Sequence, residues 1–155
     1  RHRACRKNPP LLPPSPQRMS GCPIAITVFK FYFASHIPAT AILDAQFILP
    51  KPLVPSFCQA ALKFYTDTFQ DPLFLDAPLW FKSLMFCETT IQLPFFFVAL
   101  HALSKKKSWI KIPIICYAVH AATTLVPILT NHLLAPEVPD DKRVPLFVLF
   151  LPYLL

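Results

Sequence analysis

Three apolar runs constrain this chain more than any other feature of its sequence. They cover residues 22–43, 79–103 and 112–134, and a helix that crosses a bilayer needs about 20 predominantly apolar residues. A fourth apolar run, 144–155, is too short to cross, and the sequence ends inside it. We therefore predict an all-α, polytopic membrane protein, a bundle of four transmembrane helices whose fourth helix is truncated.

Composition supports a membrane protein with an opened interior. The chain is 54% hydrophobic but only 15% charged, whereas about a quarter of the residues in a soluble domain are charged. Prolines 38, 94, 113 and 127 lie inside the complete runs. A proline removes a backbone hydrogen bond and kinks its helix, and kinked helices around one axis bow apart. We predict an internal ligand cavity, although prolines are also frequent in membrane helices without a special role.

The polar segments exclude several classes of function. Residues 1–21 are rich in Pro and Arg and lack apolar periodicity, so we predict a disordered or non-native tail before a transmembrane domain at 22–155. The net charge is +7, but no nucleic-acid-binding motif accompanies it, so we expect no nucleic-acid partner. The cysteines and histidines lack metal-ligand spacing, and no phosphate-binding loop is present. We predict no metal and no cofactor.

Charge also predicts the orientation of the chain in the membrane. Lys105, Lys106, Lys107 and Lys111 surround Trp109 in one short loop. Loops with this excess of lysine stay on the cytosolic side, so we place the slightly acidic segment 44–78 in the lumen. Within that segment, apolar residues recur at helical spacing, which predicts an interfacial helix over the bundle. These residues are Phe57, Ala61, Phe64, Tyr65 and Phe69.

Glu88 is the main candidate for a functional residue, because a carboxylate inside a bilayer costs at least ~2.5 kcal/mol. It lies about 13 Å from the lumenal end of the second run, at about 1.5 Å per residue. Asp44 closes the first run on the same side. The two carboxyl groups are therefore expected to meet and to share a proton. Two alternatives stay open: Glu88 as a hydrogen-bonding contact between helices, and Asp44 as a solvated helix end.

An acid pair in an apolar cavity predicts a cationic ligand with a large hydrophobic body, or a sterol whose hydroxyl binds there. Gln92 lies four residues after Glu88, on the same helical face. Aromatic side chains add cation–π attraction. The further candidates for the cavity wall are Phe69, Phe86, Tyr153, Thr124 and Tyr117, with His120 as a proton partner. For His36, His101, His120 and His132, packing is the competing interpretation.

Long stretches of the sequence resemble one family of membrane proteins. They are "SHIPATAILDAQFILP" (35–50), "QDPLFLDAPLWFKSLMFCETTIQLPFF" (70–96), "WIKIPIICYAVHAATTLVPIL" (109–129) and "PYLL" (152–155). In this order they are similar to the sigma-2 receptor branch of the EXPERA family, which also contains the emopamil-binding sterol isomerase.

The resemblance implies a non-enzymatic receptor of the endoplasmic reticulum membrane, with the nuclear envelope and endolysosomal membranes as further locations. It implies a homodimer that binds cationic amphiphilic molecules and sterols and acts in cholesterol homeostasis, with the lysosomal cholesterol transporter as a partner. By motif, Asp44 is the acid that pairs with a ligand amine and Glu88 the acid that hydrogen-bonds to it. Gln92, Tyr65, Thr124 and Tyr153 match pocket positions.

Two alternative functions follow from the same resemblance. One is sterol double-bond isomerisation, which needs acid and base groups on both sides of the ring system. The isomerase has a histidine one turn before its glutamate, where this chain has Leu84, and this difference favours binding without turnover. The other is a trafficking adaptor for the cholesterol transporter.

Overall fold

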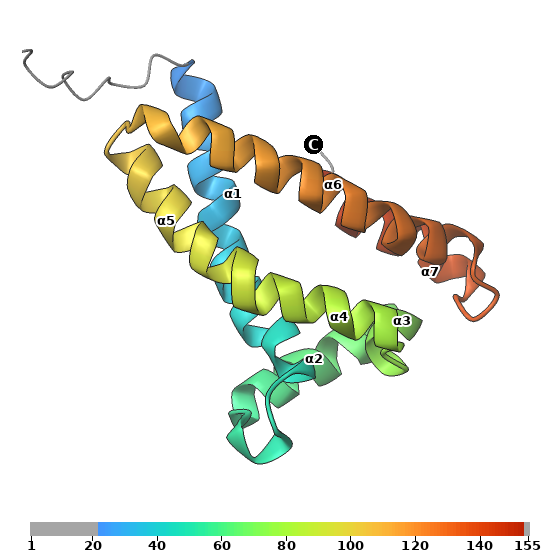
Figure 1. Ribbon diagram of the computed structural model, residues 1–155. Coiled ribbons are helices and arrows are strands. Elements are labelled where there is room, and N and C mark those ends of the chain that lie inside the picture. Colours follow the sequence, from blue (N-terminus) through green and yellow to red (C-terminus); the bar gives the residue numbers. More distant parts are fainter. Residues whose placement is uncertain (1–21, 154–155) are drawn as a thin grey trace, which may run out of the picture.

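The computed structural model describes residues 22–153, which are helical with no strand among them (Figure 1). The predicted tail, 1–21, and the last two residues lie outside the described part. The helices are α1 (Pro23–Ile42), η1 (Asp44–Phe47), η2 (Lys51–Leu53), α2 (Ser56–Phe69), α3 (Pro72–Leu75), α4 (Leu79–Cys87), η3 (Glu88–Gln92), α5 (Leu93–Ser104), η4 (Ser108–Ile110), α6 (Lys111–Leu134), α7 (Asp140–Phe150) and η5 (Leu151–Tyr153).

Three helical stretches are long and apolar enough to cross a membrane: Pro23–Phe47, Leu79–Ser104 and Ser108–Leu134. They coincide with the three apolar runs, so the predicted all-α membrane protein is confirmed. The fourth run forms a shorter helix, α7, of 11 residues. Helix α7 begins at Asp140, not at Val144 as the hydropathy suggested. The difference arises because Asp140 and Asp141 stabilise a helix N-terminus electrostatically.

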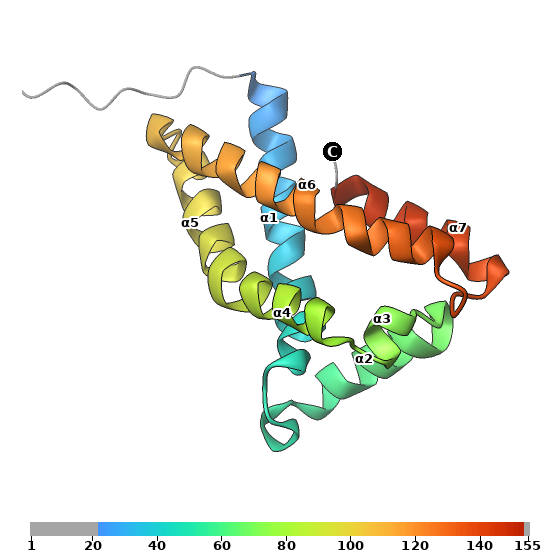
Figure 2. The same cartoon turned by 45° about the vertical axis from the view of Figure 1, so that its right-hand side comes forward.

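The helices pack as two units that share one interior. Helix α1 packs along α5, and α7 turns back along α6. Figures 1 and 2 show α4 and α5 as one long, bent stretch, with α2 near the C-terminal end of α1 and α3 beside the start of α4. This arrangement brings α1, α2, η3, α6 and the C-terminal turn around a common space.

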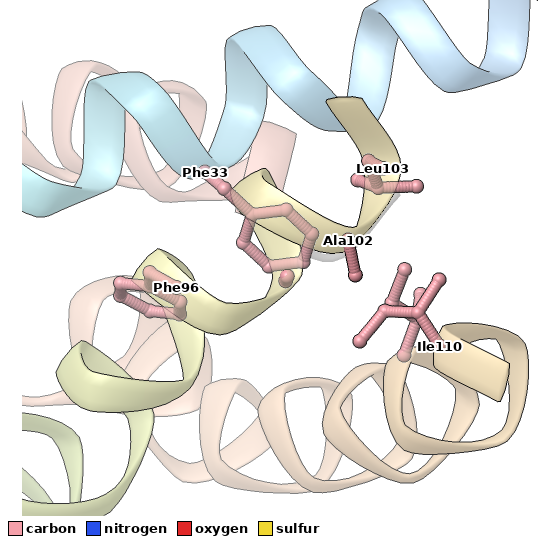
Figure 3. Packing of buried hydrophobic residues seen from close by; sticks show 7 residues of the cluster. Phe33, Phe96, Ala102, Leu103 and Ile110 are labelled. Carbon is pink, nitrogen blue, oxygen red and sulfur yellow. The ribbon is translucent and has the colours of Figure 1, made fainter. Parts of the chain in front are cut away.

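The packing of α1 on α5 depends on aromatic side chains against small ones. Phe33 of α1 is fully buried, and its ring centroid lies 5.6 Å from that of Phe96 on α5. Ala99 and Ala102 are also fully buried. Their small side chains let the two backbones approach closely, which is a common way to associate helices in membranes. Figure 3 shows Phe33 and Phe96 together in this cluster, with Ile110 closing its far side.

The second spanning stretch is not a regular α-helix in its middle. Residues Glu88–Gln92 form a π-helical turn, in which the N–H of Leu93 donates to the carbonyl of Glu88. Pro94 follows two residues after Gln92, and a proline ring clashes with the carbonyl four residues before it. Widening the preceding turn relieves this clash. The predicted effect of proline therefore takes the form of a π turn, a feature that often occurs at functional sites.

The segment between the first two spans folds back against α1. The segment forms the predicted helix, α2, Ser56–Phe69, while its place at the membrane interface stays a prediction. Gln46 joins it to the end of α1, because its Nε2 donates to the carbonyl of Ile42 at 2.6 Å and to that of Cys58 at 2.8 Å. Gln70 then ends α2 in the left-handed conformation, with φ of 51°. Helix α2 is thus held across one end of the interior.

A buried carboxylate connects the α2–α3 turn to α6. Asp71 is fully buried, and its Oδ1 accepts from the backbone N–H of Leu73 at 2.9 Å. Its Oδ2 accepts from the Tyr65 hydroxyl at 2.8 Å and from His132 Nε2 at 3.2 Å. These three donors satisfy a carboxylate that is removed from water. The sequence pattern counted Asp71 among the loop acids and missed this role, while His132 is buried in packing as one interpretation expected.

Candidate functional site

A cavity of about 250 Å³ lies between α1, α2, α4, η3, α6 and the C-terminal turn. Most of its walls are apolar or aromatic. Among the described residues that line it, none is Lys or Arg, and the carboxylic acids are Asp44 and Glu88. The cavity therefore presents negative or hydrogen-bonding groups on a hydrophobic background. The eight residues that the sequence predicted for the site all line it: Asp44, Glu88, Gln92, Tyr65, Phe69, Thr124, Tyr117 and Tyr153.

Thr40 lies between the two acids. Its Oγ1 donates to Glu88 Oε1 at 3.2 Å, and Asp44 follows it by one helical turn on the same wall of the cavity. A hydroxyl has one proton to donate and lone pairs to accept with. Thr40 can therefore donate to one carboxylate while it accepts the proton of the other, which suits an acid pair that shares a single proton. Thr40 itself is almost fully buried, with 1% of its surface exposed.

Helix periodicity explains why α1 supplies the polar wall. Tyr32, His36, Thr40 and Asp44 follow one another at intervals of four residues, and all four line the cavity. Residues four apart lie on the same face of a helix. In the second spanning stretch, Glu88 and Gln92 are also four apart, across the π turn. The acid pair is thus formed by two polar helical faces that meet.

A second polar group lies at another part of the wall. The hydroxyls of Tyr32 and Tyr117 are 2.7 Å apart, and the His36 Nδ1–H donates to the carbonyl of Tyr32 at 2.9 Å. This bond leaves His36 Nε2 as an acceptor. The ring of Tyr153 meets His36 edge-on, with 4.5 Å between ring centroids. The cavity therefore offers hydrogen-bonding groups at the acids and also among these rings.

The lumenal part of the wall, as the charge pattern orients it, is aromatic. The ring centroid of Tyr65 on α2 lies 5.1 Å from that of Phe69 on the same helix and 4.6 Å from that of Phe74. The hydrogen bond to Asp71 fixes Tyr65 in this position. Burial, and next the Asp71 charge, raise the pKa of the Tyr65 hydroxyl well above its usual value. Tyr65 therefore remains a neutral donor to Asp71.

Two residues proposed for the wall lie elsewhere. Phe86 is 53% exposed and does not line the cavity. It precedes Glu88 by two residues, so it projects from a different face of the helix. His120 is also exposed on α6 and is not a proton partner of the acids. On the α1 face of the cavity, sequence reasoning missed Tyr32, His36 and Thr40, although their spacing from Asp44 was the available signal.

Comparison with known proteins bears on the same region of the chain. Residues 57–155 match the EXPERA (expanded EBP superfamily) family. The chain belongs to the EXPERA family. The matched region of this EXPERA protein contains Glu88, Gln92 and the aromatic wall of α2, while Asp44 and Thr40 lie before it.

Individual relatives extend the similarity over most of the EXPERA chain. It is 42% identical over 138 residues to Sigma intracellular receptor 2 of Xenopus tropicalis, covering 83% of this chain and 80% of that protein. The human Sigma intracellular receptor 2 is 42% identical over 137 residues, covering 80% of this chain and 77% of the relative. Efficient mitochondria targeting-associated protein 19 of Schizosaccharomyces pombe is 35% identical over 104 residues, covering 63% of this chain and 55% of that protein.

Proposed function

We propose that this protein is an intracellular membrane receptor that binds cationic amphiphiles and sterols between its helices and takes part in cholesterol homeostasis. In this proposal the three spanning stretches and α7 form the four-helix bundle predicted from the sequence. The resident ligand lies in the cavity with its polar group at the acid pair. The names of the Xenopus and human relatives support the assignment as a receptor.

The observation that carries the proposal is that two carboxyl groups, those of Asp44 and Glu88, line one apolar cavity, with Thr40 bonded to Glu88 beside them. Two nearby carboxylates cannot both ionise at low cost in a medium of low dielectric constant. If the pair keeps one proton, it has a net charge of about −1, and none of the described residues that line the cavity is a Lys or Arg that could balance it. A protonated amine supplies that balance, and Asp44 is the acid that we assign to it. Aromatic rings such as Tyr65 and Phe69 surround the organic part of the ligand.

A sterol would use the same cavity in a different manner. Its hydroxyl can donate to one carboxylate and accept from a protonated carboxyl or from Gln92, so it needs no charge of its own. The fused rings would contact the apolar wall formed by Met85, Leu125 and Ile128. Sterols and cationic amphiphiles therefore compete for one site in this proposal.

We propose binding without turnover. Isomerisation of a ring double bond requires one group to protonate a carbon and another to deprotonate a second carbon. In this proposal Asp44 and Glu88 bind the same end of the ligand, so they do not flank its ring system. Leu84 lies one helical turn before Glu88, and a leucine side chain cannot donate a proton. Conversion of a sterol to its ring double-bond isomer by the purified protein would contradict this assignment.

The location and partners of the protein extend the proposal. We place it in the endoplasmic reticulum membrane as a homodimer, with the lysosomal cholesterol transporter as a partner. A role as a trafficking adaptor is the second candidate, and it is separable. Association with the transporter would persist after the acid pair is replaced if the adaptor role is independent of ligand.

The test compares the affinity of a radiolabelled cationic amphiphile for the Asp44→Asn variant with its affinity for the wild-type protein. Truncating one partner of a buried charge pair costs about 2–5 kcal/mol, so the affinity should fall at least about thirtyfold. Asp67→Asn is the matched control, because Asp67 is an exposed acid on α2 paired only with Lys63. Unchanged affinity in a well-expressed Asp44→Asn protein would rule out the assigned site.

A further inference from the structure

A second hollow lies outside the cavity, between α1 and α2. It has a volume of about 310 Å³, and we call it the outer groove. Pro38 and Ile42 of α1 form one side of it, and Ala61 and Phe64 of α2 form the other. Among the described residues that line it, the hydroxyl of Tyr65 is the one polar side-chain group. The outer groove therefore offers an almost entirely apolar surface.

The outer groove and the cavity are separated by a single layer of side chains. Ala39, Leu43, Tyr65 and Phe69 line both spaces. Leu43 directly precedes Asp44 in the chain, so the layer begins beside the acid pair. A ligand bound at Asp44 is therefore separated from the outer groove by one layer of side chains.

The volume of the cavity leaves little space for a long tail in addition to the rest of a ligand. Sites for drug-sized molecules usually enclose about 300–1,000 Å³, and the cavity has about 250 Å³. The outer groove adds a space of similar size. The combined volume of the cavity and the outer groove lies well inside the usual range.

The surroundings of the outer groove are suited to lipid. Helix α1 belongs to a spanning stretch, Pro23–Phe47. On α2, Phe64 is 71% exposed and Phe57 is 64% exposed. An apolar face left open by the protein in this position is covered by acyl chains of the bilayer. An alkyl chain in the outer groove would continue into that hydrocarbon.

We propose that the outer groove is a second subsite, which takes the alkyl tail of a cationic amphiphile whose head lies at the Asp44–Glu88 pair. This inference rests on the proposed function. It adds a passage between α1 and α2, so that the head of the ligand lies in the cavity and its tail lies in the outer groove. The ligand class that fits best is accordingly a linear amphiphile with one amine and one long apolar chain.

The separating layer also indicates which side chain must move. The hydroxyl of Tyr65 is held by Asp71 at 2.8 Å, whereas Phe69 makes only ring and apolar contacts. Rotation of Phe69 therefore opens the passage without breaking a hydrogen bond. Ala39 and Ala61 leave room for a chain, because neither projects beyond its Cβ.

The test is a series of primary n-alkylamines, from hexylamine to hexadecylamine, that compete with a radiolabelled amphiphile on the full-length protein. Each methylene buried in the outer groove should tighten binding about fourfold. Ala61→Phe and Ile42→Phe fill the groove from its two sides. Ala60→Phe is the matched control, since Ala60 is exposed on α2 and does not line the groove.

We expect both groove variants to bind hexylamine within about twofold of the wild type and to lose the gain from the longer tails. The control should keep that gain. The inference is overturned if the groove variants retain the wild-type dependence on chain length, or if they lose hexylamine as well. Asp44→Asn separates the two proposals, because wild-type affinity of that variant for hexylamine contradicts the proposed function whatever the longer amines do.

Discussion

At the scale of single residues, the site depends on a hydroxyl that neither carboxylate can replace. Thr40 donates to Glu88 and lies one helical turn before Asp44 on the same wall of the cavity. Without it, two acids would face each other in a medium of low dielectric constant with no neutral group between them. Their repulsion would then favour a proton on both, and the cavity would lose its charge. Thr40 therefore positions the acid pair without needing to touch a ligand.

Thr40→Val tests this role, because valine keeps the shape of threonine and removes only the hydroxyl. A hydrogen bond to a charged group contributes about 1.5–3 kcal/mol, so the affinity for a cationic amphiphile should fall about tenfold to a hundredfold. Equilibrium binding of a radiolabelled cationic amphiphile measures this affinity. Thr40→Ser retains the hydroxyl and should restore most of the affinity. Equal affinity of the Val and Ser variants would assign Thr40 a packing role only.

Periodicity explains which site residues could be predicted from the sequence. Glu88 was conspicuous because of its cost in an apolar run, and Gln92 followed from it by one helical turn. Thr40 and His36 were not conspicuous, because a threonine or histidine in a membrane helix is usually a packing residue. Phe86 was assigned wrongly because aromatic character alone does not specify a helical face. The ligand roles of the eight cavity residues stay predictions.

At the scale of elements, two local features control the shape of the site. The π turn at Glu88–Gln92 adds a residue to the helical turn before Pro94. It lets Glu88 and Gln92 both line the cavity even though the helix axis changes there. The second feature is Asp71, which joins the α2–α3 turn to α6 through Tyr65 and His132. It holds the aromatic wall against the spanning bundle.

Asp71→Ala should destabilise the protein strongly. It leaves three buried donors without an acceptor, and each buried unsatisfied group costs about 1–3 kcal/mol. We expect a loss of at least about 3 kcal/mol, measured as a lowered midpoint of thermal unfolding in detergent. Asp67→Ala is the control, because Asp67 is 62% exposed in its pair with Lys63, and exposed pairs contribute about 0–1 kcal/mol. A similar midpoint for both variants would show that the Asp71 contacts contribute little.

The sequence predicts the positions of those helices that are marked by a hydrophobic pattern. The three spans and α2 have strong periodic or continuous apolar patterns, and these patterns predicted their positions closely. The first turn of α7 was missed because its four charged residues, Asp140–Arg143, gave it the appearance of a loop. The burial of Asp71 could not be predicted, since its partners Tyr65 and His132 come from different elements and meet only in the folded chain.

At the scale of the whole molecule, charge and cavity position together predict how the protein is oriented. The lysines of the loop between α5 and α6 lie at one end of the bundle. The α2–α3 segment and the loop from α6 to α7 lie at the other end, as Figure 2 shows. The acid pair lies toward this second end. If the lysine loop is cytosolic, the acids and the aromatic wall are closer to the lumenal surface.

Cysteine labelling in sealed microsomes tests this orientation. Lys106 and Glu137 are exposed, one in the lysine loop and one between α6 and α7. Each is replaced by Cys in a chain whose five native cysteines are changed to Ala. A membrane-impermeant maleimide should then label Lys106→Cys on intact vesicles, and Glu137→Cys only after permeabilisation. The reason is the preference of lysine-rich loops for the cytosolic side. The reverse pattern would put the acid pair near the cytosol, so that cytosolic amines would reach it by the shorter path.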